Sequence, residues 1–363
     1  MIEGMDWSDI GERVRESRLA AGLSQDELGA RIDLERTKIA KIESGDRRVD
    51  ALELSRLASA LGVPMGHLLH RPPQVLSRRT QLVDDTNSDV ARQSYQIEAA
   101  LLAWLRDVRQ LVDLAVLNLR PSLTYCDPVS DADGARKAAL WMREKLGIGL
   151  EPIETLMAVC EQAGQLVLVA DIGGEGASLV DGDAAVAVVS AQLEPGRRRT
   201  TAAHELGHLV MGDEYSSDLG VNASRADREN VIDAFAAELL LPSEVVSTAH
   251  SSTDLRGELV KLAATYRTSW SLVTRQADHI GVLDHAQQRR WSLSSPTRAE
   301  LRESVGWAPQ PDLDTVKVPP SYAHAVMQAW EKDYITPVRA VELMHGQIVL
   351  EDLPAKSDLE LEP

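Results

Sequence analysis

Residues 200–211 hold the residue types and the spacing that are needed to bind a metal ion. They contain His204-Glu205-Leu206-Gly207-His208, in which the two histidines lie four positions apart. On a helix, side chains at that spacing project from one face about one turn apart, so two neutral imidazoles can bind one zinc ion. Glu205 follows the first histidine, and its carboxylate can take a proton from a water that attacks a carbonyl. The segment therefore predicts a zinc site with a general base.

A zinc site of this kind needs a third protein ligand, and Glu229 is the residue that we expect to supply it. Glu229 lies on a second expected helix, residues 225–240, and Asp233 follows it four positions later. In that arrangement, Asp233 would accept a hydrogen bond from the other ring nitrogen of a ligand histidine. Nearby acidic side chains also compete for the role of third ligand: Asp213, Glu214, Asp227, Asp233 and Glu238.

The two segments around these residues resemble the ImmA/IrrE metallopeptidases of bacteria and their mobile elements. R-R-T-T-A-A-H-E-L-G-H is followed by E-N-V-I-D-A-F-A-A-E-L-L-L-P, and the resemblance spans roughly residues 131–284. It implies a gluzincin-like zinc metallopeptidase in which Glu205 is the base and in which the metal ligands are His204, His208 and Glu229.

The chain departs from the pattern of that family at two places. Thr-Thr at residues 200–201 replaces the usual Phe-Thr, and Ile-Asp at residues 232–233 replaces the usual Ala-Asn. The second change leaves the metal chemistry intact and alters the groups that surround the ligands.

Residues 9–69 predict five short helices. Ser24, with Glu27 three positions later, is a capping box that begins a helix, and Gly45 and Gly62 are suited to end two others. G-L-S-Q-D-E-L-G, I-A-K-I-E-S-G and A-L-G-V-P-M-G-H-L-L resemble an Xre/Cro-type helix-turn-helix domain along its whole length. In such a domain the second helix of the pair, here residues 35–43, enters the major groove of DNA.

This resemblance implies a set of contacts with double-stranded DNA. Base edges would be contacted by Arg36, Thr37 and Lys41, and phosphates by Gln25, Lys38, Arg47 and Arg48. Glu35 stands where the start of this helix usually has serine or threonine. Its carboxylate would repel phosphate unless it accepts a hydrogen bond from a cytosine amine. The alternative is a helical interaction module of the same fold that has lost DNA binding.

Composition indicates the class of protein and its compartment. The 363 residues suffice for two or three domains, and the net charge of −18 disfavours loose attraction to nucleic acid or to anionic membranes. Two distant cysteines, Cys126 and Cys160, indicate a reducing compartment rather than a disulfide framework. With no apparent signal peptide and no apolar run of membrane-spanning length, we expect a cytoplasmic protein.

The expected fold is mainly α with a small β-sheet, an α+β class. Apolar, β-branched runs at residues 165–170 and 184–190 predict two strands. In zinc peptidases with this motif, an edge strand often pairs with an extended substrate. The second run could do that by β-augmentation.

The remaining segments complete a division into four parts. The helix-turn-helix domain is residues 1–72. Residues 73–128 are a linker followed by a connecting helix at residues 95–119. This helix either connects or dimerises domains, or it packs on its own domain. The metallopeptidase domain is residues 129–284. Residues 285–363 form a helical extension, interpreted as a partner-binding module, with an acidic tail.

Two functions of different classes follow. The first is a DNA-binding, zinc-dependent, site-specific endopeptidase and transcriptional regulator that cleaves a cognate repressor or toxin. The second is a non-proteolytic, antitoxin-like regulator that neutralises a partner protein and represses its own operon. Both imply an inverted-repeat operator and a homodimer. Glu205 favours the enzyme because it is not a ligand, and Tyr215 is a candidate to stabilise an oxyanion.

Overall fold

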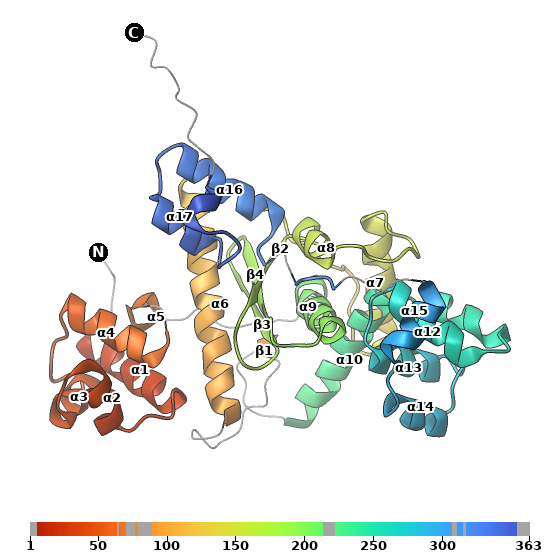
Figure 1. The fold of residues 1–363 in the computed structure, drawn as a ribbon, viewed down its shortest axis with the longest axis horizontal. Helices are drawn as coiled ribbons and strands as arrows, with labels where there is room; N and C mark the ends of the chain where they lie inside the picture. Colours follow the sequence, from red (N-terminus) through yellow and green to blue (C-terminus); the bar gives the residue numbers. More distant parts are fainter. Residues whose placement is uncertain are drawn as a thin grey trace, which may run out of the picture.

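A computed structural model describes residues 6–63, 65–69, 77–78, 89–212, 222–306, 311–314 and 317–353 of the chain. Within these ranges the protein is mainly helical with one small sheet, as the sequence predicts (Figure 1). The polar linker lies largely outside these ranges, and the acidic tail lies wholly outside them. None of the described helices is both long enough and apolar enough to span a membrane.

Five short helices form the N-terminal unit: α1 (Trp7–Ala20), α2 (Gln25–Ile32), α3 (Arg36–Glu43), α4 (Ala51–Leu61) and α5 (Met65–Leu69). The expected capping box begins α2, because Ser24 Oγ accepts from the Glu27 amide and Glu27 accepts in return from the Ser24 amide. Gly62 ends α4 with φ at 68°, a conformation that glycine adopts without strain. Leu28, Ile39 and Leu57 are buried together, so the five helices share one core.

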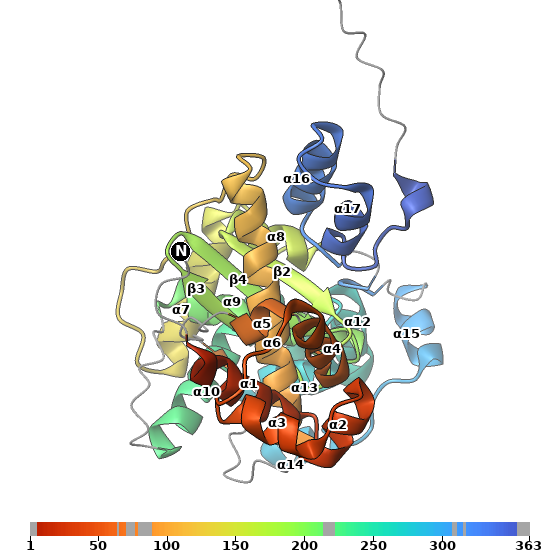
Figure 2. The same cartoon turned by 90° about the vertical axis from the view of Figure 1, so that its left-hand side faces the viewer.

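A long helix, α6 (Asp89–Asp113), lies beside this unit (Figures 1 and 2). The Tyr95 hydroxyl on α6 is 2.5 Å from Ser17 Oγ and 2.5 Å from His67 Nε2. Burial lowers the pKa of His67 to about 4, so its ring is neutral at neutral pH when it makes this hydrogen bond. The N-terminal unit is therefore docked on α6 rather than only tethered to it.

The end of α6 differs from the sequence-based expectation. The helix was expected to run to residue 119, but it ends at Asp113. Ala115 takes a left-handed conformation with φ at 54°, and the Val116 amide donates to the Leu111 carbonyl at 3.1 Å. This pattern terminates a helix, and the apolar residues that follow are packed as an extended segment.

The sheet has the strand order β1-β3-β4-β2, with β1 (Ser77–Arg78), β2 (Gln165–Ala170), β3 (Gly176–Asp181) and β4 (Ala184–Ser190). The predicted strands are β2 and β4, which pair in parallel. The sequence did not indicate β3, which pairs antiparallel with β4. The expectation that residues 184–190 form an edge strand is wrong, since β4 is hydrogen-bonded on both sides.

Each face of the sheet packs against its own set of helices. Alternate residues of β4 point to opposite faces: Ala185, Ala187 and Val189 belong to one apolar cluster, and Val186 and Val188 belong to another. One face packs on α6, α16 (Pro320–Glu331) and α17 (Pro337–Leu343), and the other packs on α7 (Ala132–Lys145), α8 (Leu156–Gln162) and α9 (Pro195–Val210) (Figure 1).

The helix α6 is thus part of the core that covers the sheet. Trp104 on α6 is fully buried, and its indole nitrogen donates to the Leu166 carbonyl of β2 at 2.9 Å. Tyr322 on α16 is also fully buried, with its ring centroid 4.4 Å from that of Trp104. The helix α6 therefore packs on the sheet as well as on the N-terminal unit, so it connects these two parts of the chain.

The remaining helices gather beyond α9. They are α10 (Asn222–Leu240), α11 (Ser243–Ser247), α12 (Leu255–Thr265), α13 (Trp270–His279), α14 (His285–Ser292) and α15 (Arg298–Val305), with a short 3₁₀ turn at Thr248–Ser251. A second 3₁₀ turn, Leu350–Asp352, packs on α17 instead. The helices α14 and α15 form the first part of the expected helical extension. Capping boxes at Asp284 and Thr297 begin them.

Candidate metal centre

Helix α9 carries both histidines into the interior of the protein. It begins with Pro195 at its first turn and lies between the sheet and α10. His204 and His208 are 0% and 1% exposed, and Glu205 between them is 0% exposed. Burying three such polar side chains is costly unless they have partners or a metal to bind. The burial therefore favours a functional site over a chance occurrence of this residue spacing.

The donor atoms of His204, His208 and Glu229 converge. His204 Nε2 is 3.2 Å from His208 Nε2 and 3.0 Å from Glu229 Oε2, and all the donor atoms lie within 4.8 Å of one another. Ligands about 2.0–2.1 Å from a tetrahedral zinc ion are about 3.3 Å apart. The two separations from His204 Nε2 are close to that value, so two ring nitrogens and a carboxylate oxygen could bind one zinc ion.

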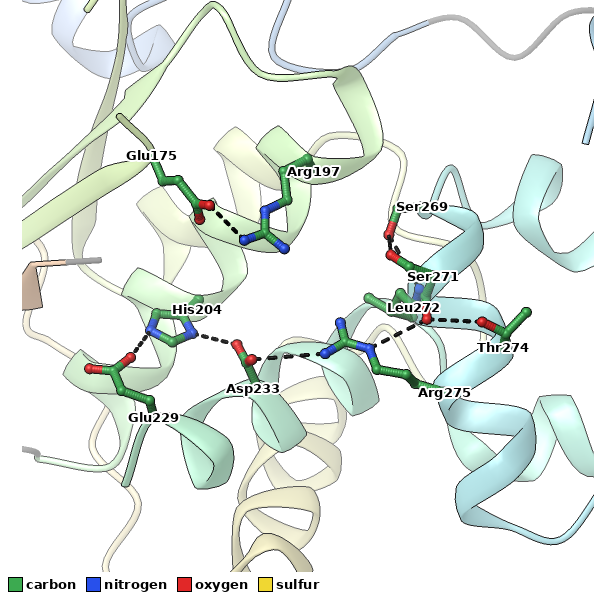
Figure 3. A network of polar contacts seen from close by, with 10 residues as sticks. All are labelled: Glu175, Arg197, His204, Glu229, Asp233, Ser269, Ser271, Leu272, Thr274 and Arg275. Atoms are coloured by element: carbon green, nitrogen blue, oxygen red, sulfur yellow. Dashed lines mark hydrogen bonds and ion pairs between the residues drawn. The ribbon is translucent and has the colours of Figure 1, made fainter. Parts of the chain in front are cut away.

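Asp233 lies on the far side of the same imidazole. Its Oδ1 is 2.9 Å from His204 Nδ1, and its Oδ2 is 3.9 Å from Arg275 Nη1 on α13 (Figure 3). A carboxylate accepts from an N–H, so this contact places the ring proton on Nδ1 and leaves the Nε2 lone pair directed at Glu229. Arg275 was not singled out from the sequence, because no local pattern links it to α10.

Glu205 is held at one carboxylate oxygen only. Its Oε2 accepts a hydrogen bond from Ser178 Oγ on β3 at 2.7 Å, and its main-chain carbonyl accepts from Gln165 Nε2 at 3.1 Å. Its Oε1 is buried and has no hydrogen-bond partner in the described part of the chain. An oriented carboxylate with one open oxygen has the form of a general base. Sequence reasoning missed Ser178 because it missed β3.

Comparison with known proteins assigns two parts of the chain. Residues 160–277 match the IrrE N-terminal-like domain family, and residues 9–71 match a helix-turn-helix domain family. The chain therefore carries an IrrE-like domain and a helix-turn-helix domain. Together, the two domains indicate a transcriptional regulator.

Individual relatives cover different parts of the chain. The control protein C.BamHI of Bacillus amyloliquefaciens is 40% identical over 61 residues, which are 16% of this chain and 75% of that protein. A crystal structure of Bacillus thuringiensis PlcR in complex with the peptide PapR7 and DNA aligns with 94% of this chain and 93% of that one, at 10% identity and a TM-score of 0.18. A score that low does not indicate a shared overall fold.

The helix-turn-helix domain presents its predicted DNA contacts unequally. Arg36, Thr37, Lys38 and Lys41 are all exposed on α3. Arg48 is exposed as well. The remaining two candidates bind within the domain: Gln25 Nε2 donates to Glu43 at 2.8 Å, and Arg47 forms an ion pair with Glu53 at 2.6 Å. The free cationic surface of this domain is therefore centred on α3. Tyr215, the candidate oxyanion stabiliser, lies outside the described residues.

Gly207 sets the distance between the two helices of the IrrE-like site. A Cβ atom added there would lie 2.9 Å from Phe235 Cδ1 and 3.1 Å from Ile232 Cγ2 on α10. Both distances are shorter than ordinary carbon contacts. The absent side chain therefore lets α10, with Glu229 and Asp233, approach α9 closely.

Gly207→Ala is expected to lower the free energy of unfolding by about 1–3 kcal/mol, because a buried methyl group must displace Phe235. Urea unfolding measures this loss. The control is Gly134→Ala on α7, where a Cβ would meet its nearest atom at an ordinary 3.4 Å. The free energy of unfolding of that variant should equal that of the wild type or exceed it by about 0.4–1 kcal/mol. Equal effects of the two changes would contradict close helix packing at Gly207.

Proposed function

We propose that this protein is a zinc-dependent, site-specific endopeptidase and DNA-binding regulator that cleaves a cognate repressor or toxin protein. The observation that carries the proposal is the buried Glu205 carboxylate, which has one oriented oxygen and one open oxygen beside the His204, His208 and Glu229 donor set. A protein that only bound its partner would gain nothing from this carboxylate, because Glu205 is not a ligand.

The chemistry divides between the ligands and the base. A zinc ion held by His204, His208 and Glu229 would lower the pKa of a water and polarise the peptide carbonyl. Glu205 Oε1 would accept the proton of the attacking water and return it to the leaving amine. Ser178 would hold Oε2, so that the carboxylate does not rotate away. Asp233 would keep the His204 ring in the orientation that directs Nε2 inward.

The outer edge of β3 is where an extended substrate would add to the sheet. Ser178 is on this strand, so a peptide paired there would run beside Glu205. In the structure β1 occupies part of this edge, with Ser77 opposite Ser178 and Arg78 opposite Ala177. A substrate would have to displace that short pairing, which involves only two residues of β1.

The same pairing favours a second candidate function, binding of a partner without cleavage. With β1 paired to it, the edge of β3 is partly closed to a substrate strand, which suits a regulator that binds its partner without cutting it. Deleting residues 322–350 would not test that function. It would remove Tyr322, which is fully buried against Trp104, and would expose the core of the sheet.

The DNA-binding part of the proposal is that a homodimer binds an inverted repeat through α3. Arg36→Ala is expected to weaken operator binding by about 1–3 kcal/mol and to relax sequence preference, because arginine pairs with guanine edges. Lys38→Ala should weaken binding to all DNA sequences alike. It should also reduce the slope of log affinity against log salt concentration by about one. Titration of operator and scrambled duplexes at several salt concentrations separates the two effects. Absence of a footprint on its own promoter at low salt would show that the domain is an interaction module.

A further inference from the structure

A cavity of about 350 Å³ lies at the start of α9, away from the two histidines. Gly196, in the first turn of α9, touches the start of α13, because an added Cβ would lie 2.7 Å from the Ser269 amide nitrogen. Ser269 is the N-cap of α13. The first amides of a helix have no partner within the helix, and both N-termini carry partial positive charge. Two helix N-termini therefore meet at one cavity, and the carboxylate of Glu194, the N-cap of α9, also lines it.

The charged side chains that line the cavity are unequally paired. Arg197 is turned toward Glu175, at 2.6 Å, and Arg199 forms a buried ion pair with Asp312 (Figure 3 shows the first pair). Arg267 donates to the neutral carbonyl of Glu154 at 3.0 Å, and it has no carboxylate partner among the described residues. Within the described ranges, the guanidinium of Arg267 therefore has no counter-ion at the cavity wall.

Two buried polar atoms of lining residues also lack partners. Arg199 Nε and Thr268 Oγ1 have no hydrogen-bond partner within the described ranges, although these residues are only 1% and 8% exposed. Leaving a buried donor unsatisfied costs about 1–3 kcal/mol. Burial lowers the pKa of Arg199, and the nearby charge of Arg267 lowers it further, while Asp312 opposes both. An anion in the cavity would pair with Arg267 and could accept from these two unsatisfied groups.

The rest of the wall is apolar and rigid. Trp270 is buried, its indole nitrogen donates to the Trp291 carbonyl at 2.7 Å, and the Arg256 guanidinium lies 5.2 Å from its ring. Pro296 and Leu301 complete this side of the cavity. A preformed apolar wall facing a few polar groups is the usual form of a small-molecule site, and the volume is in the range of such sites.

We propose that this cavity binds a small organic anion, with its phosphate or carboxylate between Arg267 and the start of α9 and its apolar body against Trp270. The site does not depend on peptidase activity. Gly196 and His204 are on the same helix, about 12 Å apart along its axis at 1.5 Å per residue. Binding at the cavity should therefore stabilise the helix that carries the histidines.

The test is calorimetric titration of the full chain with phenyl phosphate and with benzoate, which distinguishes the two head groups. Phenol serves as the neutral probe and inorganic phosphate as the probe without an apolar body. We expect saturable binding of at least one aromatic anion, tighter than that of phenol and of inorganic phosphate. Arg267→Gln should weaken it about tenfold or more, because a hydrogen bond to a charged group is lost. Thr268→Val should weaken it by a smaller factor.

Matched variants keep the test decisive. Arg267→Lys keeps the charge and should retain part of the affinity, whereas Arg290→Gln removes an exposed arginine of α14 and should have no effect. Unfolding temperatures without ligand show that each variant is folded. If the wild type binds neither anion, or if Arg267→Gln and Arg290→Gln bind equally well, the proposal is wrong.

Discussion

Glu205→Gln is expected to leave the metal content unchanged and to lower cleavage of the cognate partner by about 10²–10⁴-fold, the range for loss of a general base. Glutamine keeps the volume of the side chain and can still accept from Ser178 Oγ. It cannot accept the proton of the attacking water, so only the chemical step fails. The uncut partner should remain bound, and binding to the operator should be normal.

Co-expression with the proteins encoded beside this chain, followed by mass spectrometry of the partner, measures the effect. The matched control is Glu244→Gln, the same change at an exposed glutamate on α11, which should cleave like the wild type. If Glu205→Gln keeps the full regulatory effect of the wild type while its partner stays uncut, the protease hypothesis is wrong and the binding function is established. Loss of the regulatory effect, together with accumulation of the uncut partner, would establish proteolysis.

His204→Ala or His208→Ala is expected to reduce the zinc content from about one per chain to nearly none, because each removes one of three protein ligands. Glu229→Ala should weaken zinc binding strongly. Asp233→Ala should weaken it by about 10–100-fold, since Asp233 orients His204 without touching the metal. Elemental analysis and competition with a chelator measure these differences. A chelator should also lower the unfolding temperature of the wild type and leave that of His204→Ala unchanged.

His250→Ala is the control for this series, because His250 is exposed on a 3₁₀ turn outside the site. It should carry as much zinc as the wild type. If Asp233→Ala empties the site while Glu229→Ala retains the metal, the two carboxylates have exchanged roles. If both His204→Ala and His208→Ala keep their zinc, the donor set at α9 and α10 is not the metal site.

Local rules account for what the sequence predicted. The pair His204 and His208 shares a face because residues four apart on any α-helix do so. The capping box at Ser24 and the left-handed Gly62 depend only on neighbouring residues, and the structure places both as expected. The strands β2 and β4 were recognisable because each is a continuous apolar run. Their burial on both faces explains why no alternation was visible.

Long-range packing decided the rest. The strand β3 begins with Gly176 and contains Ser178, so its composition is not that of a typical strand, and only its pairing with β4 makes it one. Nothing local shows that Ser178 contacts Glu205, that Arg275 approaches Asp233, or that Arg267 faces a cavity.

The sequence by itself determined which side chains can bind a metal and which helix carries them, because helix geometry repeats within a few residues. The tertiary structure alone decided that β4 is central, that α6 and α16 cover the sheet, and how each carboxylate of the site is oriented. Those features depend on contacts between residues far apart in the chain. Such contacts follow from the packing of whole faces against one another, and no short window of sequence contains them.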